Sequence, residues 1–133
     1  MIIKEIKDED LTLAQALYCS CFSKEIKNVS LSLSGSLLGL YLHHELIGMI
    51  QIDFINLLFE NKRLAYFNSF CIKDTYQNQG YGAKLLEYSI LFVKENGATV
   101  IQLTSNSTRL VAHRLYQKFG FQKMDTNFYQ KII

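Results

Sequence analysis

The feature that most constrains the fold is a change of hydrophobic period in the middle of the chain. Between residues 37 and 72, short apolar runs suited to strands alternate with polar breaks. From Tyr81 onward, apolar residues recur at helical spacing, and the stripe ends at Asn96-Gly97, a pair that suits a helix end. A chain that changes from strands to an amphipathic helix in this way is expected to fold as a layer of helix packed on a sheet.

The same patterns predict the other elements. We expect strands at residues 2–6, 37–42, 46–56, 64–72, 98–105, 121–124 and 127–133. We expect helices at residues 11–22, 81–95 and 108–119, and a short helix or loop at residues 24–34. The prediction is a single α/β domain over residues 1–133, with a mixed sheet covered by helices on both faces.

Composition excludes several classes of protein. Of 133 residues, 49% are hydrophobic and 20% charged, as in an ordinary globular domain. No apolar stretch approaches the roughly 18 residues of a membrane span, and the N-terminus lacks the build of a signal peptide. We therefore expect a cytoplasmic protein with no membrane partner. The net charge of +2, with scattered basic residues, argues against nucleic-acid binding.

Cysteine and histidine residues do not favour a metal site. Cys19, Cys21 and Cys71 cannot all pair, and Cys-x-Cys without further ligands is a poor metal spacing. His43 and His44 are adjacent, so on a strand they point to opposite faces. We interpret the cysteines as reduced thiols and the histidines as turn or surface residues, and we predict no metal.

A glycine-containing turn, Gln77-Asn78-Gln79-Gly80-Tyr81-Gly82, joins a predicted strand to a predicted helix. The first amides of a helix lack internal partners, and glycine lets an anion approach them. The turn is either simply tight or an anion site, and the residues alone leave both interpretations open. A nucleoside-triphosphate loop needs Gly-Lys-Ser/Thr, and the dinucleotide motif needs a third glycine where Leu85 stands, so neither fits.

A third pattern fits this turn. Gln-x-x-Gly-x-Gly before a helix resembles the pyrophosphate loop of the GNAT superfamily of acyl-CoA-dependent N-acyltransferases. Residues 104–121 resemble the second motif of that superfamily through Ala112, Tyr116, Gly120 and Phe121, in a form similar to a bacterial subset. The resemblance implies a GNAT-like α/β (α+β) fold: a mixed, mostly antiparallel central sheet of six to seven strands, flanked by helices, with the fourth and fifth strands splayed apart.

The resemblance further implies acetyl-CoA as cosubstrate, lying between the splayed strands at residues 64–72 and 98–105. Splaying leaves backbone groups unpaired, and the pantetheine arm of the cofactor can pair with them. The implied cofactor-binding residues are Phe70, Cys71 and Ile72 through their backbones, Gln77, Asn78, Gln79, Gly80, Tyr81 and Gly82 at the pyrophosphate, and Asn106 and Arg109. Helix capping is the competing interpretation of Asn106.

By the same resemblance, Tyr116 is the acid that protonates the departing thiolate, and a backbone N–H near Cys71 or Ile72 donates to the oxyanion. A phenol with a pKa of about 10 is protonated at neutral pH. Tyr116 also lies on an apolar helix stripe, which suits a core tyrosine. His113 lies on another face of that helix and is not expected to be a base.

The base is the point where this chain departs from the family pattern. Many relatives carry a glutamate at the position of Asn68, which cannot usefully accept a proton. The base remains open between a water relay touching Asn68 or Ser69, a carboxylate such as Asp53, and bulk solvent. Cys71 has no adjacent His–Asp arrangement, so we interpret it as a packed strand cysteine and not as a nucleophile.

These residues predict an N-acetyltransferase that transfers an acetyl group from acetyl-CoA to a primary amine within a ternary complex. The acceptor is a small molecule or a protein, and the residues do not identify it. The alternative is a non-catalytic acyl-CoA-binding or regulatory domain, suggested by Asn68. Homodimers are common in the family, and the sequence leaves the oligomeric state open.

Overall fold

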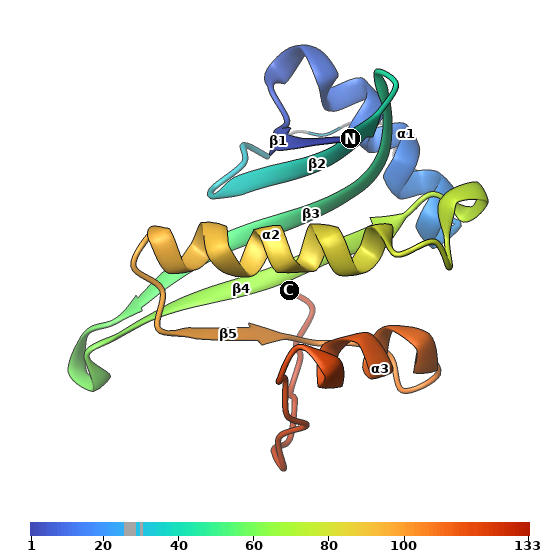
Figure 1. The fold of residues 1–133 in the computed structure, drawn as a ribbon. Coiled ribbons are helices and arrows are strands. Elements are labelled where there is room, and N and C mark those ends of the chain that lie inside the picture. The colour runs from blue at the N-terminus through green and yellow to red at the C-terminus, as the bar shows by residue number, and fades with distance from the viewer. Residues whose placement is uncertain (26–28, 30) are drawn as a thin grey trace.

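The computed structural model describes residues 1–25, 29 and 31–133. The strands are β1 (Ile2–Glu5), β2 (Ser36–Leu42), β3 (Glu45–Leu57), β4 (Lys62–Ile72) and β5 (Val100–Leu103) (Figure 1). The helices are α1 (Leu11–Phe22), α2 (Tyr81–Glu95) and α3 (Leu110–Lys118), with 3-10 turns η1 (Asp8–Asp10), η2 (Leu58–Glu60) and η3 (Asp74–Tyr76). None of the helices in these ranges is long and apolar enough to cross a membrane.

The strands form one sheet in the order β1-β2-β3-β4-β5. Pairs from β1 to β4 are antiparallel. The turn between β2 and β3 places His43 and His44 at positive φ (49° and 69°), the conformation of a two-residue hairpin turn. β5 runs parallel to β4, and the crossover that a parallel pair requires is made by α2.

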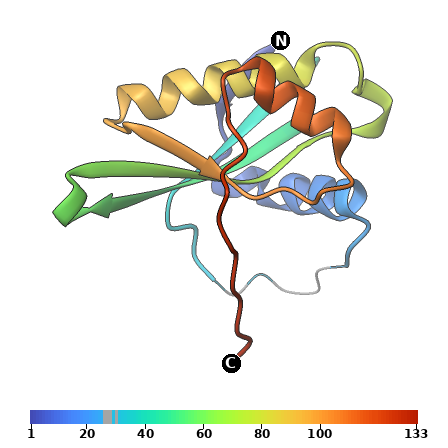
Figure 2. The same cartoon turned by 90° about the horizontal axis from the view of Figure 1, so that it is seen from below.

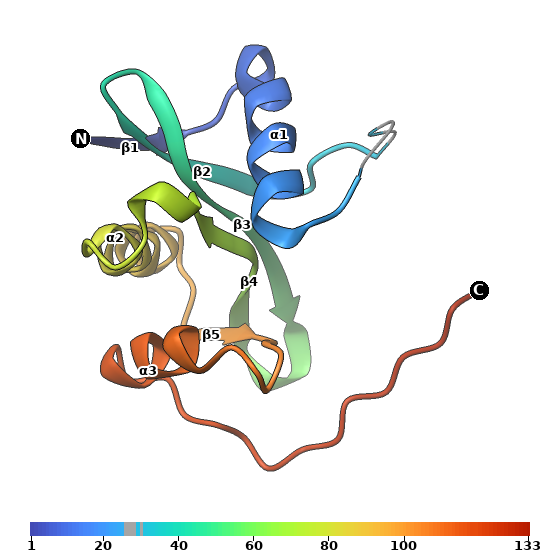
Figure 3. The same cartoon turned by 90° about the vertical axis from the view of Figure 1, so that its right-hand side faces the viewer.

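Helices cover both faces of the sheet (Figure 3). On one face, α2 buries Leu85 and Leu86 completely against a core that includes Ile50, and α3 lies on the same side. On the other face, Leu17 of α1 packs with Met49 in a second, smaller core. The apolar stripes predicted from helical spacing are therefore the surfaces that the helices bury.

The predicted sheet of six to seven strands is wrong in number. The described part of the chain forms five strands, because residues 121–124 and 127–133 are assigned to no strand. Every residue from 122 to 133 is exposed, and a strand has no stable form without a neighbour to accept its backbone hydrogen bonds. The prediction for residues 24–34 falls partly on residues 26–28 and 30, which lie outside the described residues.

Candidate functional site

β4 loses one of its two partners halfway along its length. Its parallel pairing with β5 ends at Phe67↔Leu103, whereas β4 itself continues to Ile72. Beyond Leu103 the chain turns into the loop before α3 and no longer follows β4. Backbone groups of residues 68–72 that face this side therefore have no strand partner.

A β-bulge lies in β4 at the same place. Two residues of β4 lie between Asn68 and Cys71, whereas only one residue of β3 lies between their partners, Gln51 and Met49. Ser69 has a φ of 54°, and its N–H donates to Oδ1 of Asn68 at 2.8 Å. Because a bulge bends its strand, it directs the second half of β4 away from β5.

A cavity of about 480 Å³, here called the inter-strand cavity, opens where the two strands part. Its walls come from β4, the end of β5, the loop into α3, α3 itself and the end of α1. The predicted site residues that line it are Phe70, Asn106, Arg109 and Tyr116. Cys71 and Ile72 and the turn from Gln77 to Gly82 lie outside the lining, farther along the chain from the bulge.

The backbone of Ile72 faces the side that β5 has left. The Lys73 N–H donates to the Ile47 carbonyl of β3 at 2.7 Å. Hydrogen-bond direction alternates along an antiparallel strand, so the Ile72 N–H and C=O point away from β3. The Ile72 carbonyl accepts a hydrogen bond from Nε2 of Gln77 at 3.0 Å. The Ile72 N–H is therefore the backbone group of this residue that is available to a ligand on that side. The same alternation turns the backbone of Cys71 toward β3.

Helix α2 begins without a side-chain cap. Gly80 is the N-cap residue, and the first turn carries no acidic side chain. The Lys84 N–H donates to the Gly80 carbonyl at 3.2 Å, so the N–H groups of Tyr81, Gly82 and Ala83 have no partner within the helix. These donors and the helix dipole together favour an anion at this end of α2.

The two glycines of this turn have different roles. Gly80 has a φ of 86°, a conformation that favours glycine, and a Cβ added there would meet no atom within 4 Å. A Cβ on Gly82 would make only ordinary contacts, the nearest at 3.6 Å. Backbone conformation therefore explains Gly80, and the open space in front of it leaves room for a ligand.

The side chain of Gln77 makes hydrogen bonds within the protein. Its Nε2 donates to the Ile72 carbonyl and to Oδ1 of Asp74, the latter at 3.2 Å, and its backbone N–H donates to the Asp74 carbonyl at 3.3 Å. Gln79 similarly donates through Nε2 to the Thr75 carbonyl at 3.2 Å. The contact with Ile72 ties the turn to the end of β4, and the contacts with Asp74 and Thr75 hold the turn together within itself.

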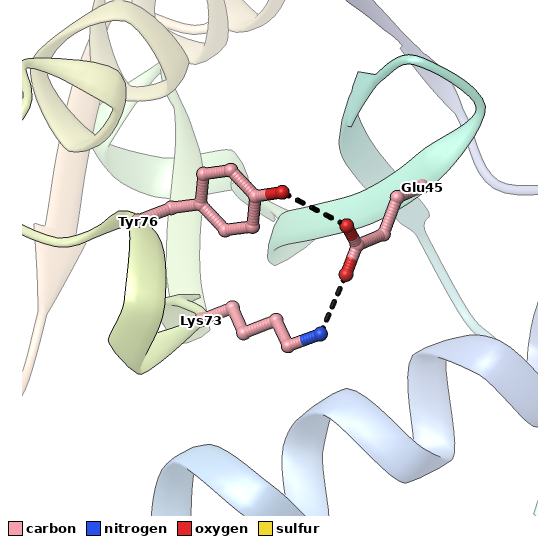
Figure 4. A network of polar contacts seen from close by, with 3 residues as sticks. All are labelled: Glu45, Lys73 and Tyr76. Carbon is pink, nitrogen blue, oxygen red and sulfur yellow. Dashed lines mark hydrogen bonds and ion pairs between the residues drawn. The ribbon is translucent and has the colours of Figure 1, made fainter.

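A polar network that the sequence analysis missed holds the other side of the same turn (Figure 4). The Glu45 carboxylate accepts hydrogen bonds from Nζ of Lys73 at 2.5 Å and from the Tyr76 hydroxyl at 3.0 Å. These bonds lower the pKa of Glu45, so the carboxylate stays ionised at neutral pH. No local pattern pointed to this network, because Glu45 is brought to the other two residues only by strand pairing.

Tyr116 is buried on α3 and lines the inter-strand cavity. Its ring lies 6.2 Å from that of Phe70 and 5.8 Å from that of Phe121, centroid to centroid. Burial raises the pKa of the Tyr116 phenol, and Arg109 offsets part of the rise. The ring therefore belongs to the core, and the residue also borders the cavity in its protonated form; its role as an acid stays a prediction.

The loop before α3 is held by its own side chains. Oδ1 of Asn106 accepts hydrogen bonds from the Thr108 N–H at 3.0 Å and from the Thr108 hydroxyl at 2.9 Å, which supports a local turn-forming role for Asn106. Nε2 of His113 lies 3.2 Å from the hydroxyl oxygen of Ser105. The Arg109 guanidinium lies 5.5 Å from the centroid of Phe22, a residue of α1.

The sequence also contained no indication that α1 forms part of the cavity wall. Tyr18 and Phe22, one helical turn apart with ring centroids 4.8 Å from each other, both line the cavity. The aromatic pair at helical spacing was visible in the sequence as a possible apolar face. Its position beside β4 depends on how α1 packs on the sheet.

The cavity lining contains no carboxylate among the described residues. Asp53, the carboxylate considered as a base, lies outside the lining, and its Oδ1 accepts a hydrogen bond from the Ser34 hydroxyl at 2.5 Å. Its Oδ2 accepts one from Nε2 of Gln51 at 3.3 Å. Asn68 lines the cavity but uses its Oδ1 on the bulge.

Cys71 is buried beside Cys21 of α1. A hydrogen bond with Cys21, together with burial, raises the pKa of the Cys71 thiol well above its usual value. A thiol held neutral in this way is a poor nucleophile. The geometry supports the interpretation of Cys71 as a packing residue.

Known proteins resemble this chain in family and in fold. The model of the acetyltransferase (GNAT) family matches residues 4–121. No curated protein matches the chain in sequence. Many solved structures share this fold, and three of them illustrate the likeness. A transcriptional regulator from Bacillus halodurans C-125 is 21% identical with a TM-score of 0.84, covering 98% of this chain and 99% of that one.

The second is an aminoglycoside acetyltransferase from an uncultured soil metagenomic sample, in complex with trehalose, at 18% identity and a TM-score of 0.81, covering 99% of this chain and 96% of that one. The third is a ribosomal-protein-alanine N-acetyltransferase from Brucella melitensis, at 11% identity and a TM-score of 0.85, covering 99% and 100%. At these identities the likeness establishes the shared fold.

Proposed function

The chain belongs to the acetyltransferase (GNAT) family, and on this premise we propose that it transfers an acetyl group from acetyl-CoA to a primary amine. The observation that carries the proposal is the line of unpaired backbone donors that starts at the parted strands and ends at the uncapped start of α2. A ligand that matches this line has an amide-bearing arm at one end and a diphosphate at the other. Acetyl-CoA has that build.

The proposed cofactor pose follows from the donors. The pantetheine amides pair with backbone groups of residues 68–72, chiefly at Phe70 and Ile72, whose partner strand has departed. The diphosphate accepts hydrogen bonds from the N–H groups of the turn, of which Tyr81 and Gly82 are free of partners within the helix. Asn78, Gln79 and Gly80 complete the turn, and Gln77 positions it through Ile72.

The proposed chemistry uses two groups near the point where β4 and β5 part. The Ile72 N–H donates to the oxygen of the thioester carbonyl as it becomes an oxyanion, since that N–H points away from β3. The Tyr116 phenol, kept neutral by burial, donates its proton to the departing thiolate of CoA. The amine nitrogen attacks the carbonyl carbon, the C–N bond forms, and the C–S bond breaks.

The amine must lose a proton, and the residues of the cavity suggest that water takes it. Because no described carboxylate lines the cavity, the base is a solvent molecule held by hydroxyl groups such as those of Ser69 and Ser105. Arg109, also in the lining, disfavours a cationic acceptor nearby and promotes loss of that proton.

The acceptor class is proposed from the fold neighbours and the cavity together. Two of the fold neighbours are an aminoglycoside acetyltransferase and a ribosomal-protein-alanine N-acetyltransferase. For this chain, the part of the cavity next to α1 carries aromatic and polar side chains, from Tyr18 to Lys24. We expect the acceptor to enter there, as a small amine or as the end of a peptide.

The test has two arms. Acetyl-CoA is titrated into the protein by calorimetry, with release of CoA thiol then followed against a panel of polyamines, aminoglycosides and peptides with free N-termini. Tyr116→Phe, assayed beside the parent chain, should lower kcat by about 100-fold or more while the Kd for acetyl-CoA changes less than about threefold. Absence of binding heat would remove the proposal, and unchanged turnover in Tyr116→Phe would remove the assignment of the acid.

A second candidate, a non-catalytic acyl-CoA-binding domain, is favoured by one observation. Asn68 stands where relatives carry the base, and its Oδ1 is occupied by the Ser69 N–H. This candidate predicts acetyl-CoA binding without thiol release for every amine in the panel.

A further inference from the structure

The charged side chains that line the inter-strand cavity are all basic in the described part of the chain. They are Arg109, at the start of α3, and Lys24, after the end of α1. Glu25, next to Lys24, and Asp74, after the end of β4, lie outside the lining. The cavity therefore presents a positive potential to a molecule that enters it.

These two cations come from elements on opposite faces of the sheet, α3 on one face and the end of α1 on the other (Figure 2). The Arg109 guanidinium lies 5.5 Å from the ring centroid of Phe22 on α1, within the range of a cation–π contact. Such a contact orients the guanidinium without using its N–H donors. Neither Arg109 nor Lys24 forms an ion pair with an acidic residue that the structure describes. The ion pairs of the described residues belong to other lysines, Lys7 with Glu5 and Lys73 with Glu45.

The phosphates of the proposed cosubstrate do not account for these charges. The donors proposed for the diphosphate belong to residues 77–82, which lie outside the lining. The pantetheine amides and the acetyl thioester, which the proposed pose places along residues 68–72, carry no charge. An anion for Arg109 must therefore come from the acceptor.

A polycationic acceptor and a zwitterionic acceptor meet this lining differently. Like charges a few ångströms apart raise the free energy of each other's charged form, and no carboxylate in the described lining offsets that repulsion. A carboxylate within the acceptor removes this cost, because a guanidinium can bind both of its oxygens through parallel N–H···O bonds. The lining therefore favours an acceptor that brings its own anion.

We propose that the acceptor is a small amino acid whose carboxylate binds Arg109 while its amino group faces the acetyl carbon. The proposal rests on the proposed acetyl transfer and names the class of acceptor for that site. Lys24 adds positive charge on the α1 side. The paired rings of Tyr18 and Phe22 offer an apolar surface to the side chain of the acceptor.

The transfer converts the amino acid to its N-acetyl derivative. The neutral amine attacks the acetyl carbon, the C–N bond forms and the C–S bond breaks, and the thiolate of CoA takes a proton from Tyr116. Water accepts the protons that the nitrogen loses and returns one to Tyr116, so each ammonium group that reacts releases one proton to the solvent. The positive lining aids the first step, because it lowers the pKa of the bound amine.

The first test compares acceptors that differ in the anion. Tyrosine, leucine and β-alanine are assayed against their carboxamides, beside spermidine and an aminoglycoside, with release of CoA thiol as the signal. Rates are expressed per neutral amine, because a carboxamide has the lower amine pKa. For each pair that reacts, kcat/KM should be at least about tenfold higher for the amino acid than for its carboxamide, and higher than for either polycation.

The second test removes the guanidinium. Arg109→Gln should raise KM for the preferred amino acid at least about tenfold, while KM for its carboxamide and the Kd for acetyl-CoA change less than about threefold. Arg109→Lys, which keeps the charge without the bidentate geometry, should recover part of the loss. Arg114→Gln is the matched control, because Arg114 is exposed on the same helix and lies outside the lining. It should behave as the parent chain, and thermal unfolding checks that all three variants fold.

Failure of this proposal can be told apart from failure of the acetyl transfer on which it rests. The amino-acid class is wrong, with transfer intact, if a polycation is the best acceptor or if carboxamides react as fast as their amino acids. It is also wrong if Arg109→Gln weakens acetyl-CoA binding as much as it raises KM, which would make Arg109 a residue of the cosubstrate site. Acetyl-CoA binding with no thiol release from any amine overturns both proposals.

Discussion

The two halves of β4 show how one strand serves both stability and function. From Leu64 to Phe67 the strand is hydrogen-bonded on both sides, to β3 and to β5, and its side chains Ala65 and Phe67 are buried in the main core. From Asn68 to Ile72 it keeps only β3, after a bulge that includes a residue of positive φ. Both halves bury side chains in the core, but the second half has no partner strand on one side, and its residues from Asn68 to Phe70 line the cavity.

The comparison shows that the site forms because residues 68–72 of β4 have no partner strand on one side. A regular parallel strand at β5 would satisfy the backbone of residues 68–72 and leave no donor for a ligand. The bulge at Ser69 and the turn of the chain after Leu103 prevent this. Substitutions in the two halves should therefore act on different observables.

The largest expected effect is on stability in the paired half. Phe67→Ala removes a ring that is 2% exposed and should lower the free energy of unfolding by about 3–5 kcal/mol, measured by urea denaturation. Phe70→Ala, in the unpaired half, is the matched control. Its ring is partly exposed to the cavity, so we expect less than half of that loss, together with weaker acetyl-CoA binding. Equal losses in both would contradict the division of the strand.

The next largest effect is expected in the turn before α2. Gly80→Ala places a side chain at a φ of 86°, which costs about 1–2 kcal/mol, and should also weaken acetyl-CoA binding about tenfold by displacing the first-turn amides. Gly97→Ala is the control, because Gly97 has a φ of 87° at the other end of α2. It should show a similar loss of stability with unchanged Kd. A parallel change in Kd for both variants would argue against a phosphate site at the start of α2.

A smaller effect is expected at Asp53, on the strand that pairs with β4. Asp53→Asn should change kcat less than about threefold, since the carboxylate lies outside the cavity lining and is occupied by Ser34 and Gln51. Steady-state kinetics over a range of pH provides the measurement. A loss of two orders of magnitude, with loss of the acidic limb of the pH profile, would identify Asp53 as the base.

The smallest effect is the one expected from pH at Tyr116. Burial raises its pKa above the usual value, so the phenol keeps its proton as pH rises, and any rate due to it is lost only above about pH 10. The stability contributed by the neutral phenol has the same sign: it is present below the unfolded pKa and is lost as pH rises through the folded one. A pH–kcat profile that falls between pH 7 and 9 in the parent chain, but not in Tyr116→Phe, would contradict this assignment.

Much of the fold followed from local patterns. The helical stripe after Tyr81 and the strands before it were predicted because period and apolar content are properties of neighbouring residues. The family motifs directed attention to Gly80 and Tyr116; the structure places Gly80 at the start of α2 and Tyr116 in the lining of the cavity, and their roles stay predictions. The Glu45 network and the α1 wall at Tyr18 and Phe22 escaped prediction, because residues distant in sequence meet there only through packing.

The sequence by itself determined, through its hydrophobic period, which of the segments before Phe121 are strands or helices, and it determined membership of the acetyltransferase (GNAT) family. The tertiary structure alone decided where β5 leaves β4, that Asp53 is engaged outside the cavity, and that the alternating segment after Phe121 has no strand partner among the described residues. The physical reason is that periodicity reports which face of an element is apolar. Whether a backbone edge finds a partner depends on what the rest of the molecule brings beside it.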